Sequence, residues 1–303
     1  MAYLLLVFTV LFWVGNSVLA RAIHLEFPPV TLAFSRWSLA LLIVLPFLIP
    51  RLRREWPVIR AHWPIILLLA ILGIACFNTL VYTGLQTTLA TNATLLHSVI
   101  PVMILIICRV FLKQAVSLRQ WVGVSISLVG VLVLLTQARL DALLQLQFNR
   151  GDLWVFAAVV DWALYSVLLR YKPVELSAFT FFGITVLIGV LALLAPMLLE
   201  LSQGRLPEFT LRTGATVLYM AIFPSILSYL CWNRGVAELG APVAGLFIHL
   251  MPLFGLLLSV LLLGEQVQAF HFAGIALIFA GIYLAVVTET LRSIKTTESP
   301  CKS

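Results

Sequence analysis

Ten long apolar runs dominate this 303-residue chain and constrain its fold more than any other feature. A helix needs about 20 residues to cross the hydrocarbon of a bilayer. The runs lie at residues 2–20, 30–50, 64–86, 90–112, 118–137, 152–170, 177–200, 213–235, 242–263 and 268–288. Only 10% of the chain is charged and 62% is apolar, whereas a soluble domain carries roughly 25% charged residues. We therefore predict an all-α integral membrane protein with ten transmembrane helices.

The distribution of Lys and Arg between the runs predicts the orientation of the chain. With the N-terminus in the cytoplasm, thirteen of these cations lie on the cytoplasmic side and five on the opposite side. The positive-inside rule favours this orientation. It places both termini in the cytoplasm of an inner-membrane protein and makes residues 291–303 a cytoplasmic tail. The first run is also compatible with a signal peptide ending at Ala20, but it lacks the positively charged start of such peptides.

The sequence repeats itself weakly at two closely similar spacings. Shifted by 149, residues 12–21 match residues 161–170 at five of ten positions, among them Trp13 with Trp162. Shifted by 151, the coinciding pairs include Gly84/Gly235, Ala90/Ala241, Pro101/Pro252, Gly123/Gly274 and Gly130/Gly281. The matches fall at equivalent depths of equivalent runs. They divide the chain into two five-helix halves, residues 1–140 and 150–290.

An odd number of spans in each half has a topological consequence. The second half must enter the membrane from the side opposite the first, so the two halves are inverted repeats. Inverted repeats recur in secondary transporters, because two similar halves in opposite orientations provide two conformations of similar energy that open to opposite sides. We therefore expect the halves to surround a central cavity.

Several segments in their order resemble the EamA family of the drug/metabolite transporter superfamily. They are LFWVGNSVLAR (11–21), PPVTLAFSRW (28–37), the runs that contain Pro101 and Pro252, and LLLGEQVQAFHFAGIALIFAGIYLA (261–285). The resemblance implies ten helices, a central cavity between the halves, and export or exchange of small metabolites, which in some members are amino acids. One departure is that Lys113 and Gln114 stand where the second copy has Gly264 and Glu265.

Polar residues within the apolar runs are the candidate solute-binding groups, because polar side chains in a membrane bundle usually face its interior. They are Trp13, Asn16, Asn78, Tyr82, His97, Trp162, Tyr165, Tyr229, Asn233 and His249. The repeat aligns Asn78 with Tyr229 and Tyr82 with Asn233, so each half supplies one amide and one phenol. Such a set could bind a zwitterion or a planar solute. The alternative is that these groups form interhelical hydrogen bonds, which applies equally to the two histidines.

Asp161 and Arg36 are the only charged residues deep within the runs. An unpaired ion at such depth costs at least about 2.5 to 3.5 kcal/mol. Two interpretations follow. Either the two side chains form a structural ion pair, or Asp161 exchanges protons during transport.

Small residues form faces on two of the runs. Gly123, Ser127 and Gly130 lie on one, and Gly274, Ala276, Ala280 and Gly281 on the other. Such faces permit close helix contact. We expect them to pack either between the halves or between subunits, so a homo-oligomer is possible.

Other function classes lack their sequence signatures. The chain has no second deep carboxylate, nucleophile turn or His-Glu-x-x-His motif for an intramembrane enzyme, and no phosphate loop for a primary pump. A channel stays possible but lacks rings of like charge.

No metal, cofactor or nucleic-acid partner is expected, and the predicted partners are a small solute and the lipid bilayer. The sequence thus predicts a secondary transporter exporting amino acids or similar small metabolites by alternating access, with a drug or other-metabolite efflux carrier as the alternative.

Overall fold

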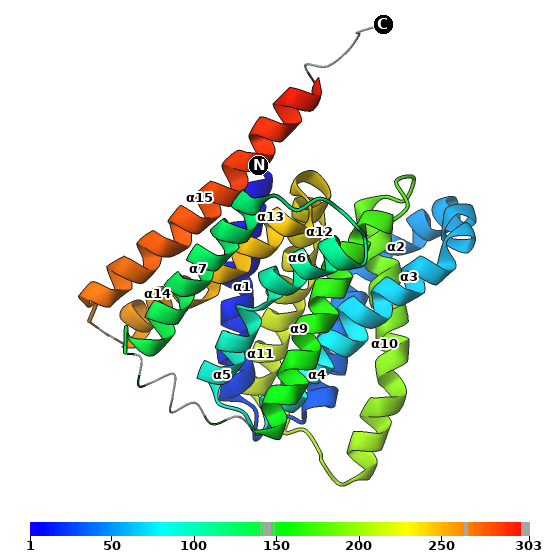
Figure 1. Ribbon diagram of the computed structural model, residues 1–303. Helices are drawn as coiled ribbons and strands as arrows, with labels where there is room; N and C mark the ends of the chain where they lie inside the picture. The colour runs from blue at the N-terminus through cyan, green and yellow to red at the C-terminus, as the bar shows by residue number, and fades with distance from the viewer. Residues whose placement is uncertain (140, 142–146, 148, 264–265, 298–303) are drawn as a thin grey trace, which may run out of the picture.

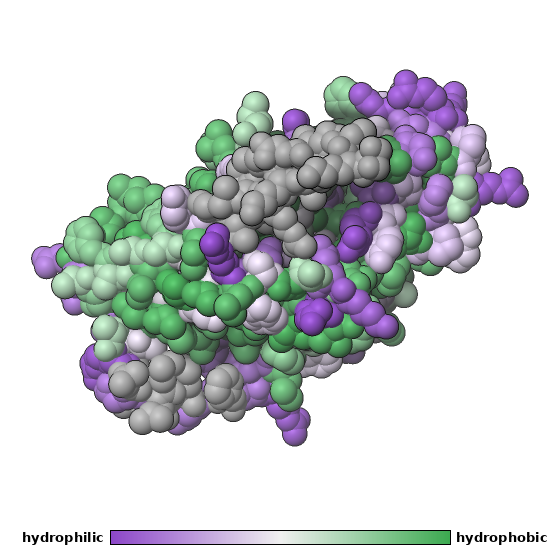
Figure 2. All heavy atoms as spheres, turned by 45° about the horizontal axis from the view of Figure 1, so that its top comes forward, coloured by the Kyte–Doolittle hydropathy of each residue, from purple (hydrophilic) through white to green (hydrophobic). Residues whose placement is uncertain are grey.

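The computed structural model describes residues 1–139, 141, 147, 149–263 and 266–297. Within these residues ten helical segments are long and apolar enough to cross a membrane, as predicted. Figure 2 shows a broad hydrophobic surface along the bundle, with hydrophilic residues concentrated toward its ends. This distribution is the one expected for a protein whose flanks face lipid.

The first half of the chain forms five spans. Its helices are α1 (Ala2–Ala22), α2 (Pro29–Ala61), α3 (Trp63–Ala70), α4 (Phe77–Gly84), α5 (Ala90–His97), α6 (Ile100–Val110) and α7 (Leu118–Thr136). The third span runs from α3 through a π-helix, η1 (Ile71–Cys76), into α4, and the fourth comprises α5 and α6.

The second half repeats this pattern. Its helices are α9 (Arg150–Leu168), α10 (Ala178–Ser202), α11 (Leu211–Met220), α12 (Ser228–Leu239), α13 (Ala241–Leu246), α14 (Met251–Leu263) and α15 (Ala269–Thr297). Short 3₁₀ turns follow α9 (Leu169–Tyr171) and separate α13 from α14 (Phe247–Leu250), and a second π-helix, η3 (Ala221–Leu227), joins α11 to α12. The two π-helices occupy equivalent places in the halves. In η3 the interruption of the α-helical hydrogen bonding coincides with Pro224, which has no backbone N–H to donate.

Two helices extend beyond their predicted runs. The second run ends at residue 50, but α2 continues to Ala61 through Pro46, Pro50 and Pro57 and ends in exposed arginines. Similarly, α15 continues through residues 291–297, while residues 298–303 of the expected tail lie outside the described residues. Hydropathy locates only the part of a helix that faces hydrocarbon, so it does not mark where a helix ends.

The two halves are inverted relative to each other. In Figure 1 the N-terminus and the end of α15 lie at the top of the bundle, whereas the end of α7 and the start of α9 lie at the bottom. The largest contacts between helices all join one half to the other: α7 with α15, α2 with α10, α1 with α12, and α4 with α9. The halves are therefore interlocked rather than placed side by side.

Reciprocal caps between α2 and α10 illustrate this inverted relationship. Near the end of α10, the Glu200 carboxylate accepts hydrogen bonds from the backbone N–H groups of Val30 (3.3 Å) and Thr31 (2.7 Å) at the start of α2. Near the end of α2, the Glu55 carboxylate accepts one from the backbone N–H of Ser177, before α10 (2.9 Å). Each helix thus places a negative charge at the other's N-terminus, where unpaired N–H groups and the helix dipole favour it.

The small-residue faces pack against each other within the chain, between the halves. A Cβ atom on Gly123 would lie 2.6 Å from the carbonyl oxygen of Gly281, and one on Gly130 would lie 2.7 Å from that of Gly274. The pairs are crosswise, since the repeat aligns Gly123 with Gly274 and Gly130 with Gly281. A two-fold relationship produces crosswise pairs of this kind.

Candidate functional site

A buried arginine lies where the two halves meet. Arg36, on α2, is only 1% exposed. Its Nε donates a hydrogen bond to Ser225 Oγ of η3 (2.9 Å), and its Nη1 donates to Asn16 Oδ1 (3.1 Å), Asn78 Oδ1 (3.2 Å) and Tyr82 OH (2.5 Å). All four acceptors are neutral. They come from both halves of the chain, so the guanidinium is held by elements of each.

Two amide–phenol pairs occupy positions that the repeat relates. Tyr82 OH donates to Asn16 Oδ1 (3.1 Å), and Tyr165 OH donates to Asn233 Oδ1 (2.8 Å). Shifts of 149 and 151 residues convert the first pair into the second with the roles exchanged. The repeat therefore preserves the hydrogen bond while swapping which helix supplies the amide.

A third connection crosses directly between equivalent residues. Asn78 Nδ2 donates to Tyr229 OH (3.4 Å), and Tyr229 OH donates to the carbonyl oxygen of Gly73 in η1 (2.5 Å). The π-helix leaves carbonyl groups without their usual helical partners, and Tyr229 binds one of them.

Aromatic rings form a layer centred on Trp162 of α9. Its ring centroid lies 4.6 Å from that of Phe77, 5.1 Å from Trp13 and 5.5 Å from Tyr229. Further contacts to Tyr165 and Trp232 extend the layer at 5.0 Å and 5.6 Å. We call these six residues the aromatic layer. Offset and edge-to-face contacts of this kind are favourable packing arrangements for aromatic rings.

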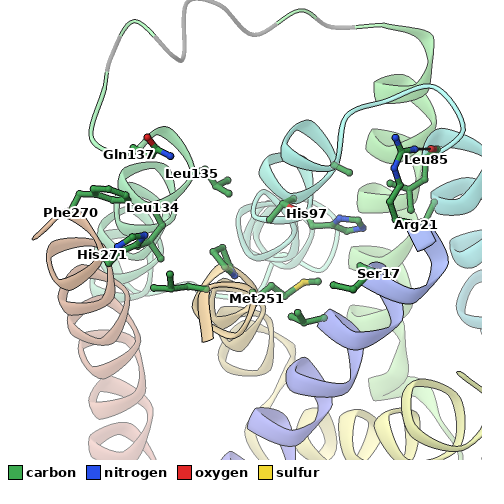
Figure 3. Close-up of a pocket in the computed structure, with 18 residues that line it drawn as sticks. Ser17, Arg21, Leu85, His97, Leu134, Leu135, Gln137, Met251, Phe270 and His271 are labelled. Atoms are coloured by element: carbon green, nitrogen blue, oxygen red, sulfur yellow. Dashed lines mark hydrogen bonds between the residues drawn. The ribbon is translucent and has the colours of Figure 1, made fainter. Parts of the chain in front are cut away.

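One small cavity is lined by residues of the aromatic layer, and two larger cavities lie toward the ends of the bundle. A central cavity of about 40 Å³ is lined by Arg36, Asn16, Asn78 and rings of the layer. A second, of about 510 Å³, reaches exposed residues at the end of α1, and we call it the Arg21 cavity. Side chains from α1, α5, α7, α14 and α15 surround it (Figure 3). A third, of about 710 Å³, reaches the end of α12, and we call it the Arg170 cavity.

The central cavity shares lining residues with only one of the other two. It shares Ser17, Val81, His97 and Met251 with the Arg21 cavity. It shares no lining residue with the Arg170 cavity. Asn233, which lines the Arg170 cavity, is hydrogen-bonded to Tyr165 of the aromatic layer. The central cavity and the Arg170 cavity are therefore separate.

The structure brings most of the candidate residues together. The candidate residues that line the central cavity are Trp13, Asn16, Arg36, Asn78, His97, Trp162 and Tyr229. Tyr82 and Tyr165 line none of the three cavities, but they hydrogen-bond to Asn16 and Asn233, which do.

His249 lies apart from the cavities. Its Nε2 is 2.8 Å from the carbonyl oxygen of Ser98 and its Nδ1 is 2.7 Å from Ser127 Oγ. Because a carbonyl group can only accept, Nε2 carries the proton and Nδ1 accepts from the serine. Both ring nitrogens thus take part in contacts between helices, the alternative considered for this residue. His97 differs, since it lines both the central and the Arg21 cavity.

The structure contradicts an ion pair between Arg36 and Asp161. No carboxylate lies within salt-bridge distance of Arg36 among the described residues. Asp161 is 7% exposed, its Oδ2 is buried without a hydrogen-bond partner, and it lines none of the three cavities. Sequence depth alone made the two residues seem matched, but Arg36 instead meets a set of neutral oxygens supplied by α1, α4 and η3.

Several apolar residues of the site escaped the sequence analysis. Phe77, Val81, Ile100, Ile248 and Met251 line the central cavity. In a chain that is mostly apolar, such residues carry no signal of their own. Their position next to polar candidates, as with Phe77 beside Asn78, is the only local indication. Within the described residues, no three His, Cys, Asp or Glu side chains gather as a metal site requires.

Comparisons with known proteins agree with this architecture. The model of the EamA-like transporter family matches residues 1–136 and 149–287. An uncharacterized transporter of Bacillus subtilis, YyaM, is 30% identical over 86% of this chain and 85% of its own. A protein of Streptantibioticus cattleyicolor named a "probable terminal-alkyne amino-acid exporter" is 25% identical over 73% of this chain and 72% of its own. A crystal structure with 19% identity superposes with a TM-score of 0.75, covering 98% of this chain and 99% of that one.

Proposed function

Because the chain belongs to the EamA-like transporter family, within the drug/metabolite transporter superfamily, we propose that it is a secondary carrier exporting amino acids or similar small metabolites by alternating access. The family is a transporter family, and the ten spans make the protein a multi-pass membrane protein. Export and the amino-acid preference extend what the family and the relative named an amino-acid exporter suggest.

One observation carries this proposal. Two large cavities lie toward opposite ends of the bundle, and the central cavity at the aromatic layer shares lining residues with only one of them. A channel needs a continuous path, whereas a carrier exposes its central site to one side at a time. Since the halves are inverted repeats, exchanging their conformations would close the Arg21 cavity and open the Arg170 cavity.

The orientation of the protein belongs to the same proposal. The arginines at the end of α2, Arg51, Arg53, Arg54 and Arg60, are exposed at the same end of the bundle as the N-terminus. We place this end in the cytoplasm of an inner-membrane protein, following the positive-inside rule. The Arg21 cavity then faces outward, and the structure corresponds to an outward-facing state.

Counterflow in proteoliposomes tests the carrier proposal. Vesicles loaded with a mixture of unlabelled amino acids should take up external radiolabelled amino acids transiently and saturably. Tyr82→Ala and Asn233→Ala should reduce the initial rate at least about tenfold, because each leaves a buried amide or phenol without its partner. Tyr283→Ala is the matched control, since Tyr283 is 71% exposed on the bundle surface.

Three results would contradict the proposal. They are unsaturable flux, which indicates a channel; chemical conversion of the solute, which indicates an enzyme; and normal counterflow in both Tyr82→Ala and Asn233→Ala. Size-exclusion profiles that match the parent protein show that each variant has folded.

A further inference from the structure

We propose that the solute carries a carboxylate and that the Arg36 guanidinium binds it in the central cavity. This inference deepens the proposed function and rests on it. It identifies the chemical group by which the solute is recognised and the atom that recognises it, whatever the remainder of the solute is.

The charge of Arg36 is uncompensated in the structure. Its four hydrogen bonds all go to neutral oxygens, and within the described part of the chain none of the salt bridges includes it. An arginine that is only 1% exposed and lacks an anion carries a large desolvation cost. A bound carboxylate would offset this cost.

Arg36 also has hydrogen-bonding capacity to spare. Its Nε and Nη1 account for every hydrogen bond of the guanidinium among the described residues, which leaves Nη2 unused. A guanidinium has five N–H donors, arranged in a fork that matches a carboxylate. Because Arg36 lines the central cavity, we assign the unused nitrogen to an anion that enters that cavity.

The neighbouring side chains hold the guanidinium in place. Ser225 fixes Nε from η3, while Asn16, Asn78 and Tyr82 fix Nη1 from α1 and α4. Oxygen acceptors therefore hold two of the three guanidinium nitrogens and orient the group before a solute arrives. Preorganisation of this kind reduces the entropy lost on binding.

The charges along both approaches favour an anion. Arg21, His97 and His271 line the Arg21 cavity, and no acidic residue of the described part of the chain lines this cavity or the central one. Arg170, Lys172 and Arg234 line the Arg170 cavity. Its one carboxylate, Glu238, is paired with Arg234 at 2.7 Å. Cavities lined by one sign of charge concentrate ions of the opposite sign.

The charge at the centre matches a carboxylate rather than a phosphate. Arg36 is the one Lys or Arg that lines the central cavity, so it balances a single negative charge. A phosphate monoester carries about −1.5 to −2 at neutral pH. Phe77, Trp162 and Ile248 also line the cavity, and these apolar side chains suit an apolar body attached to the carboxylate.

A thiol-labelling experiment tests the recognition of anions without knowledge of the solute. In a background with Cys76, Cys108, Cys231 and Cys301 changed to Ser, Ser17→Cys places a thiol where the Arg21 and central cavities join. An anionic methanethiosulfonate (sulfonatoethyl) and a cationic one (trimethylammonioethyl) are compared, each rate normalised to a free thiol. We expect the normalised ratio to favour the anionic reagent about tenfold.

Variants at position 36 locate the source of this preference. Arg36→Gln should remove most of it, whereas Arg36→Lys should retain it because the charge remains. The matched control is Arg139→Gln. Arg139 is an exposed arginine that pairs with Asp141 and follows α7, at the end of the bundle where the Arg21 cavity lies. Equal normalised rates in Ser17→Cys overturn the proposal even if the Arg36 variants fail to fold.

A protection experiment tests the carboxylate itself. Labelling of Ser17→Cys by neutral N-ethylmaleimide is measured with 4-methylpentanoate, with its neutral isostere 4-methylpentanamide, and with inorganic phosphate. We expect only the carboxylate to slow labelling, and Arg36→Gln to abolish the effect. Protection by the amide or by phosphate, or no protection by the carboxylate, overturns the proposal.

These results separate the further inference from the proposed function. A preference for anions and protection by the carboxylate, combined with the absence of counterflow, would refute the carrier and leave the anion site standing. Counterflow that persists unchanged in Arg36→Gln would refute the anion site and leave the carrier standing.

Discussion

Several central residues contact their own counterparts in the other half. Trp13 packs edge-on against Trp162, and Asn78 donates a hydrogen bond to Tyr229. The members of these pairs are 149 and 151 residues apart, which are the two offsets of the repeat. Equivalent residues can touch only near the axis that relates the halves. The aromatic layer therefore lies on this axis, and any movement of one half relative to the other changes its contacts.

Asp161 presents a separate question at the residue scale. Its Oδ2 is buried without a hydrogen-bond partner, and a carboxylate that loses its hydration without gaining a partner is costly. We therefore predict that Asp161 exchanges a proton during transport. Asp161→Asn keeps the size of the side chain and its neutral form, so the initial rate of amino-acid efflux from proteoliposomes should lose its dependence on pH.

Asp141→Asn is the matched control for this prediction. Asp141 pairs with Arg139 and its side chain is 52% exposed, so its substitution should leave the pH profile as in the parent protein. If Asp161→Asn shows the parent's pH profile, Asp161 has no role in coupling.

At the scale of helices, contacts between the halves depend on close approach of backbones. The α7–α15 contact is the most extensive in the molecule, and four glycines in crosswise pairs make it possible. The α2–α10 contact depends instead on reciprocal glutamate caps. The α7–α15 interface has no room for added atoms at its glycines. The α2–α10 interface is instead held by hydrogen bonds at the two ends of the helix pair.

A pair of Gly→Ala substitutions tests how closely α7 and α15 are packed. A Cβ atom at position 281 would lie 2.6 Å from the backbone nitrogen of Ser127, so Gly281→Ala should destabilise the protein by about 1 to 3 kcal/mol. Gly214, on α11, is exposed and a Cβ atom there meets nothing within 4 Å. Gly214→Ala should therefore be neutral or stabilising by up to about 1 kcal/mol.

The measurement is the melting temperature of the purified protein in detergent. A lower value in Gly281→Ala with an unchanged or higher value in Gly214→Ala is expected. Equal melting temperatures in the two variants would show that the helices can separate enough to accept a methyl group.

At the scale of the whole molecule, the interlocked halves give the protein an inverted symmetry with one asymmetric feature. The repeat shift that relates the starts of α2 and α10 aligns Arg36 with Thr185, whose hydroxyl donates to backbone carbonyls of its own helix. Among the described residues, only the first half therefore supplies a buried cation to the central cavity. The symmetric framework can move between two similar conformations. The site keeps the same single arginine in both, so the group that it recognises does not change.

Labelling of two equivalent loop residues tests the inverted topology. Leu25 and Val174 are 149 residues apart, so they are equivalent positions, and they are 86% and 91% exposed. In the cysteine-free background, Leu25→Cys should react with a membrane-impermeant maleimide on intact cells. Val174→Cys should react only after the cells are permeabilised. Identical labelling of both positions would refute inversion of the halves.

Much of this architecture can be read from the sequence because its causes are local. Apolar length determines which segments enter a bilayer, so ten spans were predictable, as was the inversion that follows from five spans in each half. The polar residues around the central cavity were also identifiable, because a polar group in an apolar run stands out. The apolar lining, such as Ile248, was not distinguishable from residues that face lipid.

Tertiary structure decided which of these groups meet. The rotation of each helix about its axis is set by packing against its neighbours, and hydropathy carries no record of it. Arg36 therefore contacts Ser225, Asn16, Asn78 and Tyr82 rather than Asp161, which is also deep but faces elsewhere. The sequence determined which residues are confined to the membrane interior, and only the folded chain determined their partners, because partnership depends on contacts between segments far apart in the sequence.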